Sequence, residues 1–132
     1  MARVLLDTQI LIWYQQRNPR LTTKAHVLLL DVDNELVVSA ATWWEMAIKI
    51  SAGKLEIDLP ASMAAAARRG IGTLPLAPAH FLRVATLPYP NEKHRDPFDR
   101  LIIAQALAER IPILTADDKF SSYAGLQLLP FF

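Results

Sequence analysis

Cysteine and excess charge are both scarce in this sequence. The chain contains no cysteine, which excludes disulfide bonds, thiolate catalysis and zinc sites built on cysteine ligands. Its formal net charge at pH 7 is only +1, so the chain as a whole is not a basic nucleic-acid-binding protein. Any contact with nucleic acid must therefore come from a local patch.

Long apolar runs are also missing. A membrane-spanning helix needs about 20 consecutive apolar residues, and no run in this sequence approaches that length. The first apolar run, residues 4–6, stops at Asp7, which excludes a secretory signal peptide. Because 52% of the residues are nevertheless hydrophobic, the chain can bury a core. We therefore expect a soluble cytoplasmic protein with no membrane contact, in which residues 1–132 form a single domain without repeats or linkers.

The short motifs of several enzyme classes do not occur. The sequence contains no G-x-S-x-G nucleophile elbow, no phosphate-binding loop of the Walker type and no G-x-G-x-x-G dinucleotide fingerprint. A catalytic site must therefore be built from other side chains.

Short hydrophobic runs alternate with helix-like segments along the chain. The runs predict β-strands at residues 4–6, 36–39, 72–76, 111–115 and 126–129. The segments between them predict helices at residues 9–16, 22–30, 42–51, 60–69, 78–86 and 97–109, and a helical turn at 119–123. The helix at 97–109 is apolar almost all round, which indicates a central position. Strands separated by helices predict parallel β-α-β crossovers, hence an α/β fold whose sheet is covered on both faces.

Several acids lie near the expected carboxyl ends of the strands, where open parallel sheets carry their sites. In chain order they follow the first strand, lie one turn into the helix after the second, begin the long helix, and follow the fourth strand. These acids are Asp7, Glu45, Asp99 and Asp117, with Asp96 and Asp118 close by. The order predicts that the carboxylates gather at one edge of the sheet.

Helix capping explains the same acids one at a time. The sequence TWWE at residues 42–45 fits a capping box, and DPFD at residues 96–99 fits an N-cap, a first-turn proline and an acid at the third position. Asp7 or Thr8 fits the cap of the first helix, and Asp117 fits an ordinary turn. The two explanations are compatible, because a helix start at the edge of the sheet is also a site position.

The acids taken together favour a metal site. Two unit charges about 4 Å apart repel by roughly 4 kcal/mol at an effective dielectric constant of about 20, so a cluster of carboxylates is costly without a cation. Mg²⁺ and Mn²⁺ prefer oxygen ligands, and the hydroxyls of Thr8 and Thr115 can orient such ligands. A site of this kind supports phosphoryl chemistry, in which the ion activates a water and neutralises the developing charge.

Four segments resemble, in order and spacing, the signature blocks of the PIN-domain ribonucleases. The likeness is greatest to the VapC toxins of bacterial toxin–antitoxin pairs, and it runs from residue 4 to about residue 120. The segments are LLDTQILIW at 5–13, SAATWWEMAIK at 39–49, HRDPFDRLIIAQA at 94–106 and ILTADDKF at 113–120.

The resemblance implies a three-layer α/β/α sandwich with a central parallel sheet. It also implies an endoribonuclease that needs Mg²⁺ or Mn²⁺ and cleaves RNA phosphodiesters through an activated water. The catalytic and metal-binding acids that it implies are Asp7, Glu45, Asp99 and Asp117. Asp96, one helical turn before Asp99, faces the same way and is a possible outer ligand. The Thr-x-Asp pattern of the family selects Asp117 over Asp118, which is left a supporting position.

Basic residues just before the acidic helix start are candidates for holding RNA phosphates. These are Lys93, His94 and Arg95, which Lys49 and Lys54 can join. The alternative is a solvated loop with no role in binding. For the adjacent Trp43 and Trp44, which point about 100° apart on a helix, we expect one in the core and one toward a partner.

The resemblance also implies partners. We expect an RNA substrate, a homodimer, and a cognate antitoxin that inserts an arginine or lysine among the acids, because a guanidinium pairs well with carboxylates.

Two other functions stay open. A non-catalytic scaffold of the same fold would bind a partner through an inactive site. A magnesium-dependent phosphatase with an aspartyl nucleophile is less favoured, because such enzymes use a D-x-D arrangement and here Gln9 stands where the second acid is needed.

Overall fold

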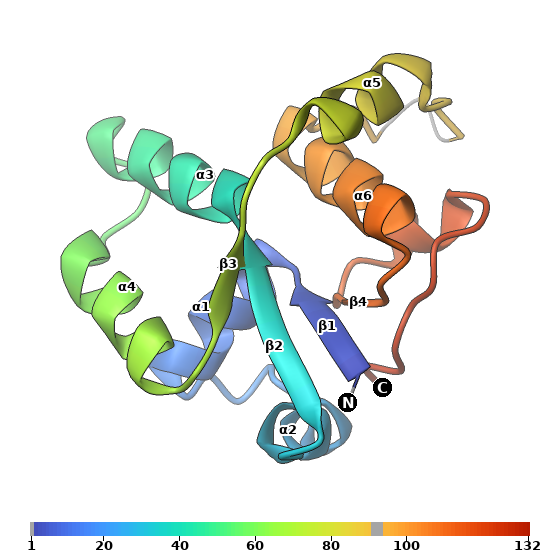
Figure 1. The fold of residues 1–132 in the computed structure, drawn as a ribbon. Coiled ribbons are helices and arrows are strands. Elements are labelled where there is room, and N and C mark those ends of the chain that lie inside the picture. The colour runs from blue at the N-terminus through green and yellow to red at the C-terminus, as the bar shows by residue number, and fades with distance from the viewer. Residues whose placement is uncertain (1, 91–93) are drawn as a thin grey trace.

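The computed structural model describes residues 2–90 and 94–132, and it contains one parallel sheet. The strands are β1 (Ala2–Leu6), β2 (Asn34–Ser39), β3 (Gly72–Leu74) and β4 (Ile113–Leu114). Their order across the sheet is β3-β2-β1-β4, so β1 lies between β2 and β4 (Figure 1). Leu5 of β1 pairs with Val37 on one side and with Ile113 on the other. The first strand is therefore the centre of the sheet.

Helices lie on both faces of this sheet (Figure 1). They are α1 (Thr8–Gln16), α2 (Thr23–Leu30), α3 (Ala40–Ser51), α4 (Leu59–Arg68), α5 (Pro78–Thr86) and α6 (Pro97–Glu109), and the 3₁₀ helix η1 (Asp118–Ser122) follows β4. The predicted α/β/α sandwich with a central parallel sheet is confirmed.

Alternating side chains of the strands build the two halves of the core. Val4 and Leu6 pack in a cluster with residues of α1, α2 and α4. Leu5 and Val37 point the other way and pack in a cluster with residues of α6. Burying each of these side chains stabilises the fold by about 1.5–3 kcal/mol. Because both faces are covered, β1 is almost wholly apolar until it reaches Asp7.

Five α-helices of the described chain begin at a polar side chain that accepts a hydrogen bond from a first-turn amide. These N-caps are Asp7, Thr22, Ser39, Asp58 and Asp96. Each such cap stabilises its helix by about 0.5–2 kcal/mol.

The start of α3 corrects one prediction. The sequence TWWE was expected to form a capping box at Thr42, but α3 begins at Ala40 and its N-cap is Ser39. The Ser39 hydroxyl accepts a hydrogen bond of 2.9 Å from the Ala41 amide. Strand β2 therefore passes directly into the helix, and Glu45 lies a full turn too far along to reach the cap.

The predicted strand at residues 126–129 is also wrong. In the described part of the chain this segment makes only an isolated bridge, between Leu128 and Ile113. Strand β4 is short as well, because Pro112 precedes it and has no N–H to donate to a neighbouring strand. The inner strand β2 begins at Asn34, two residues earlier than predicted.

The long helix α6 has the predicted bounds and the predicted central position. Its residues from Arg100 to Ala106 are all buried. Within residues 2–90 and 94–132, no helix is both long enough and apolar enough to span a bilayer.

Candidate active site

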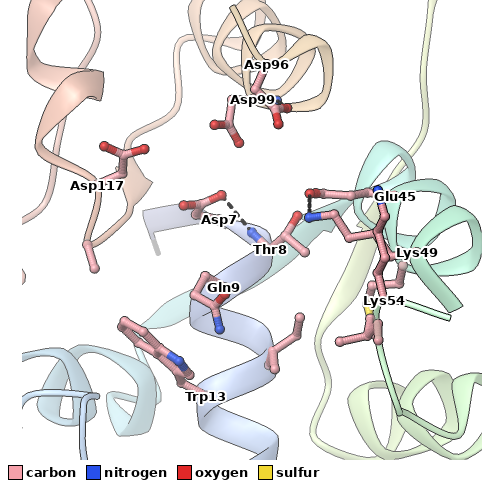
Figure 2. Close-up of a pocket in the computed structure, with 14 residues that line it drawn as sticks. Asp7, Thr8, Gln9, Trp13, Glu45, Lys49, Lys54, Asp96, Asp99 and Asp117 are labelled. Atoms are coloured by element: carbon pink, nitrogen blue, oxygen red, sulfur yellow. Dashed lines mark hydrogen bonds and ion pairs between the residues drawn. The ribbon is translucent and has the colours of Figure 1, made fainter. Parts of the chain in front are cut away.

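A cleft of about 520 Å³ opens beyond the carboxyl ends of β1 and β4 (Figure 2). It is lined from the starts of α1 and α6, from the middle of α3 and from the residues after β4. Five acids line it: Asp7, Glu45, Asp96, Asp99 and Asp117. The structure thus brings together the acids that the strand order predicted to meet. Asp118 is exposed and is not among the lining residues, so its expected supporting place in the site is wrong.

Asp7 is buried at the floor of the cleft, with 7% of its surface exposed. Its Oδ1 accepts a hydrogen bond of 2.8 Å from the Thr8 amide, and its Oδ2 accepts one of 2.7 Å from the Thr115 hydroxyl. The same hydroxyl oxygen accepts from the amide of Asp117 at 3.1 Å. Thr115 therefore fixes Asp7 and the chain of Asp117 together, as the sequence predicted for this threonine.

Thr8 has a different role from the one predicted. Its hydroxyl pairs with the hydroxyl of Thr42 at 2.9 Å, so it joins α1 to α3 instead of orienting a carboxylate. Only the backbone amide of Thr8 reaches Asp7.

Glu45 has one carboxylate oxygen paired and one without a partner. Its side chain comes from the second turn of α3 and is buried, with 5% of the residue exposed. Oε2 lies 2.7 Å from Nζ of Lys49, while Oε1 is buried with no hydrogen-bond partner among the described residues. A buried acceptor left unpaired costs about 1–3 kcal/mol, and more when it is charged. Glu45 lines the cleft, so a carboxylate with an unpaired oxygen stands at its wall, where a cation could satisfy it.

Asp96 and Asp99 stand at the start of α6. Asp96 Oδ1 accepts from the amides of Phe98 and Asp99 at 2.9 and 3.0 Å, so Asp96 is the N-cap. Asp99 is half-buried, and its Oδ2 lies 3.1 Å from Nε2 of His94. One potential ligand atom each from His94, Asp99 and Asp117 lie within 4.8 Å of one another. Two of these three atoms are carboxylate oxygens, the hard donors that Mg²⁺ and Mn²⁺ prefer, whereas the third is the imidazole nitrogen that pairs with Asp99.

Burial and crowding change the proton affinity of two of these acids. Burial is the main cause that raises the pKa of Asp7 from 3.8 to about 7; the Thr115 hydrogen bond opposes the rise and the charge of Asp99 adds to it. The pKa of Asp99 also rises to about 7, first through burial and then through the charges of Asp96, Glu45 and Asp117. Without a cation, the cleft thus holds carboxylates that resist ionisation at neutral pH.

Cations at the cleft come mainly from α3 and the segment after it. Lys49 and Lys54 both line the cleft (Figure 2). The hydrogen bond that Lys49 donates to Glu45 raises the pKa of Lys49, which therefore stays charged.

Lys93, His94 and Arg95 were predicted as candidates for contact with RNA phosphates. Lys93 lies outside the described residues, and the structure is only partly compatible with this role for His94 and Arg95. His94, a candidate for phosphate contact, is buried: only 3% of it is exposed, and both of its ring nitrogens have protein partners. Arg95 is exposed, and its guanidinium lies 4.7 Å from the centre of the Tyr89 ring.

Several residues around the cleft were not expected from the sequence. Its apolar wall includes Ile12 and Trp13. The sequence feature that could have identified them is their helical spacing after Asp7. Nothing in the sequence indicated that Tyr123 reaches His94, because the two lie 29 positions apart. The tryptophan pair behaves as predicted for packing: Trp43 packs against the core, and 55% of Trp44 is exposed.

Comparison with known proteins gives matches over nearly the whole chain. The sequence model of the family described as PIN domain matches residues 4–126. A curated relative, the ribonuclease VapC22 of Mycobacterium tuberculosis (strain ATCC 25618 / H37Rv), is 27% identical over 124 residues, which cover 93% of each chain. The segments that carry the resemblance at 5–13, 39–49, 94–106 and 113–120 all fall within the matched residues.

Solved structures share the fold. VapBC2 from Rickettsia felis, bound to a DNA fragment from their promoter, matches with a TM-score of 0.73 and 18% identity over 96% of this chain and 97% of that one. VapBC-1 from nontypeable Haemophilus influenzae matches with a TM-score of 0.69 and 21% identity over 98% of both chains.

Proposed function

Because the chain belongs to the PIN domain family, we propose that it is an endoribonuclease that depends on Mg²⁺ or Mn²⁺ and hydrolyses RNA phosphodiesters. The observation that carries the proposal is Glu45, a buried acid that lines a cleft with four further acids and whose Oε1 has no partner among the described residues. A cation is the group that would satisfy this oxygen and relieve the repulsion around it. The name of the relative VapC22, a ribonuclease, supports RNA as the substrate.

The proposed ligands are Asp7, Asp99 and Asp117, with Glu45 binding directly or through a water. When bound, the ion supplies a charge that activates water for attack on phosphorus and neutralises the charge that develops on the phosphate. Asp96 is an outer ligand in this proposal, since its Oδ1 is already occupied by the amides of Phe98 and Asp99.

Protein groups around the acids position them and the substrate. The Thr115 hydroxyl and the Thr8 amide hold the two oxygens of Asp7 in one orientation. Lys49 is tethered to Glu45 at the side of the cleft and keeps its charge, so we assign it to a phosphate oxygen of the RNA. Lys54 extends the same basic side.

We further propose that the protein is the toxin of a toxin–antitoxin pair and acts in the cytoplasm. The structures of similar fold are VapBC complexes, which supports a partner protein. The cleft offers such a partner acidic groups beside an apolar wall that contains Ile12, Trp13 and Leu55. An inhibitory tail would lay apolar side chains on this wall and place an arginine or a lysine among the acids.

We also propose a homodimer. The exposed Trp44 packs edge-on against Phe98 at a ring-centroid distance of 5.0 Å, and Ile48, one turn further along α3, is 40% exposed. Large apolar side chains exposed together are typical of a contact surface.

The test is RNA cleavage by the wild type, Asp7→Asn and Asp118→Asn. We expect Asp7→Asn to abolish cleavage with the fold retained, because it removes a charged ligand at the floor of the cleft. Asp118→Asn is the matched control, since this acid is exposed and outside the lining, and it should cleave like the wild type. Chelation should silence the wild type, and Mg²⁺ or Mn²⁺ should restore it. Cleavage that persists in chelator without carried-over metal would overturn the mechanism.

A further inference from the structure

His94 sits between an acid of the cleft and a tyrosine behind it. Its Nε2 lies 3.1 Å from Asp99 Oδ2, and its Nδ1 lies 2.8 Å from the hydroxyl oxygen of Tyr123. The imidazole also packs against the rings of Phe120 and Tyr123, at centroid distances of 5.6 and 5.5 Å. It is buried, so it cannot turn without losing both hydrogen bonds and these ring contacts.

Arg100 fixes the direction of these hydrogen bonds. Its Nη1 lies 3.2 Å from the Tyr123 hydroxyl, and a guanidinium can only donate. The hydroxyl therefore accepts from Arg100 and has its single proton left for Nδ1 of His94. The neutral imidazole then carries its own proton on Nε2 and donates it to Asp99. When Asp99 is ionised, the opposite tautomer would place a nitrogen lone pair against a carboxylate oxygen, which is repulsive.

Arg100 is itself firmly held. Its Nη1 and Nη2 donate to the carbonyl oxygens of Pro88 and Leu87 at 2.9 and 2.7 Å. Its guanidinium lies 3.6 Å from the centre of the Tyr89 ring. The series of hydrogen bonds that runs to Asp99 through Tyr123 and His94 thus begins at the buried guanidinium of Arg100, which is anchored to the backbone.

We infer that His94 and Tyr123 are positioning residues for Asp99. His94 binds Oδ2 of Asp99 and Tyr123 holds the imidazole in place, so that the other oxygen of Asp99 stays turned toward the cleft before an ion arrives. The inference rests on the proposed function, because it requires Asp99 to be a ligand. Partners that orient a ligand in this way typically contribute about 10–100-fold to metal affinity.

The test is Mn²⁺ binding measured by calorimetry, in the absence of RNA. Tyr123→Phe removes one oxygen and keeps the ring, and His94→Leu removes both hydrogen bonds. We expect both variants to bind Mn²⁺ roughly 10–100-fold more weakly than the wild type. His94→Gln keeps an N–H that can reach Asp99, and it should retain most of the affinity.

A second buried histidine provides the control for a general loss of stability. His80 is 2% exposed and accepts a hydrogen bond from the Ala77 amide, but it does not line the cleft. His80→Leu should leave Mn²⁺ affinity unchanged. Equal weakening in His80→Leu and His94→Leu would assign the effect to stability and overturn the inference.

The tautomer gives a readout that needs neither metal nor activity. The ring ¹⁵N shifts of His94 in the metal-free wild type should show a protonated Nε2 and an unprotonated Nδ1. The opposite tautomer, or wild-type Mn²⁺ affinity in both Tyr123→Phe and His94→Leu, would overturn the inference and leave the proposed nuclease standing. Absence of RNA cleavage by a wild type that binds Mn²⁺ as expected would overturn the nuclease and leave this inference standing.

Discussion

The carboxyl group of Asp7 makes the stability of the metal-free protein depend on pH. Its pKa is about 7 in the folded chain and near 3.8 when unfolded, so the folded state binds the proton more tightly. The resulting stabilisation is complete below pH ~4 and is lost as pH rises through about 7. Unfolding in chelator should therefore require less free energy at pH 8 than at pH 5, with Asp99 contributing in the same direction.

Urea denaturation across this pH range provides the measurement for that prediction. Asp7→Asn carries no titrating group at this position, so its free energy of unfolding should vary less between pH 4 and 7. If the free energy of unfolding changed equally with pH in the wild type and in Asp7→Asn, Asp7 would not titrate as its burial implies.

Crowding of the acids leads to a second expectation at the residue scale. Asp99→Asn and Asp117→Asn each remove one negative charge from the cleft, while asparagine can still cap η1 at position 117. The Tm of the metal-free protein should rise or stay the same, by roughly 3–5 °C for each kcal/mol of repulsion relieved. Stabilisation by added Mg²⁺ should weaken.

Asp58→Asn is the matched control for these two variants, because Asp58 caps α4 and does not line the cleft. Its Tm and its response to Mg²⁺ should not change. Clear drops in Tm for both cleft variants, with an intact response to Mg²⁺, would mean that capping is the only role of these acids.

The sequence predicted the acids of the cleft but, apart from Thr115, not the groups that orient them. Asp7 directly follows β1 and Asp117 comes shortly after β4, so the strand order was enough to bring them together. The direction of a hydroxyl depends on the neighbouring side chain that packs beside it, and for Thr8 that neighbour is Thr42 from another helix. The contact of Tyr123 with His94 likewise depends on how the chain after β4 folds back.

At the scale of elements, helix bounds were predicted best where a proline opens the helix. Helices α5 and α6 have their predicted bounds, because a proline marks the first position of each. The start of α3 was predicted wrongly because two hydroxyl residues that can serve as N-caps, Ser39 and Thr42, lie within one turn of each other. Only the hydrogen bond from Ala41 to Ser39 decides between them.

The cap of α3 can be tested directly. Ser39→Ala should lower the free energy of unfolding by about 1 kcal/mol, since it leaves a first-turn amide without its acceptor. Ser51→Ala, at the exposed opposite end of the same helix, should change it by less than about 0.5 kcal/mol. Chemical denaturation of both variants gives the comparison. Equal small effects would contradict the assignment of Ser39 as the cap.

At the scale of the whole molecule, a metal ion and an inhibitory partner should compete. Both neutralise the carboxylates that line one cleft, and the partner would do so with an arginine or a lysine. Raising Mg²⁺ at constant ionic strength should therefore weaken the partner's affinity in a titration. Replacing the inserted basic residue by alanine should cost about 2–5 kcal/mol of binding, which is more than a change at the rim.

An affinity that does not change with Mg²⁺ would place the inhibitory contact elsewhere on the surface. So would a scan of the partner's basic residues that leaves inhibition of cleavage intact.

The hydrogen bond from Thr115 to Asp7 joins residues 108 positions apart. Because β1 lies at the centre of the sheet and β4 closes it from the other end of the chain, the cleft is completed only by one of the most distant pairings in the sequence. Such pairings form late, after the entropy of closing a long loop has been overcome. During synthesis on the ribosome, a nascent chain in which β4 has not yet been made therefore carries Asp7, Glu45 and Asp99 without the strand that aligns them. We therefore expect the proposed nuclease activity to appear only after β4 has been synthesised.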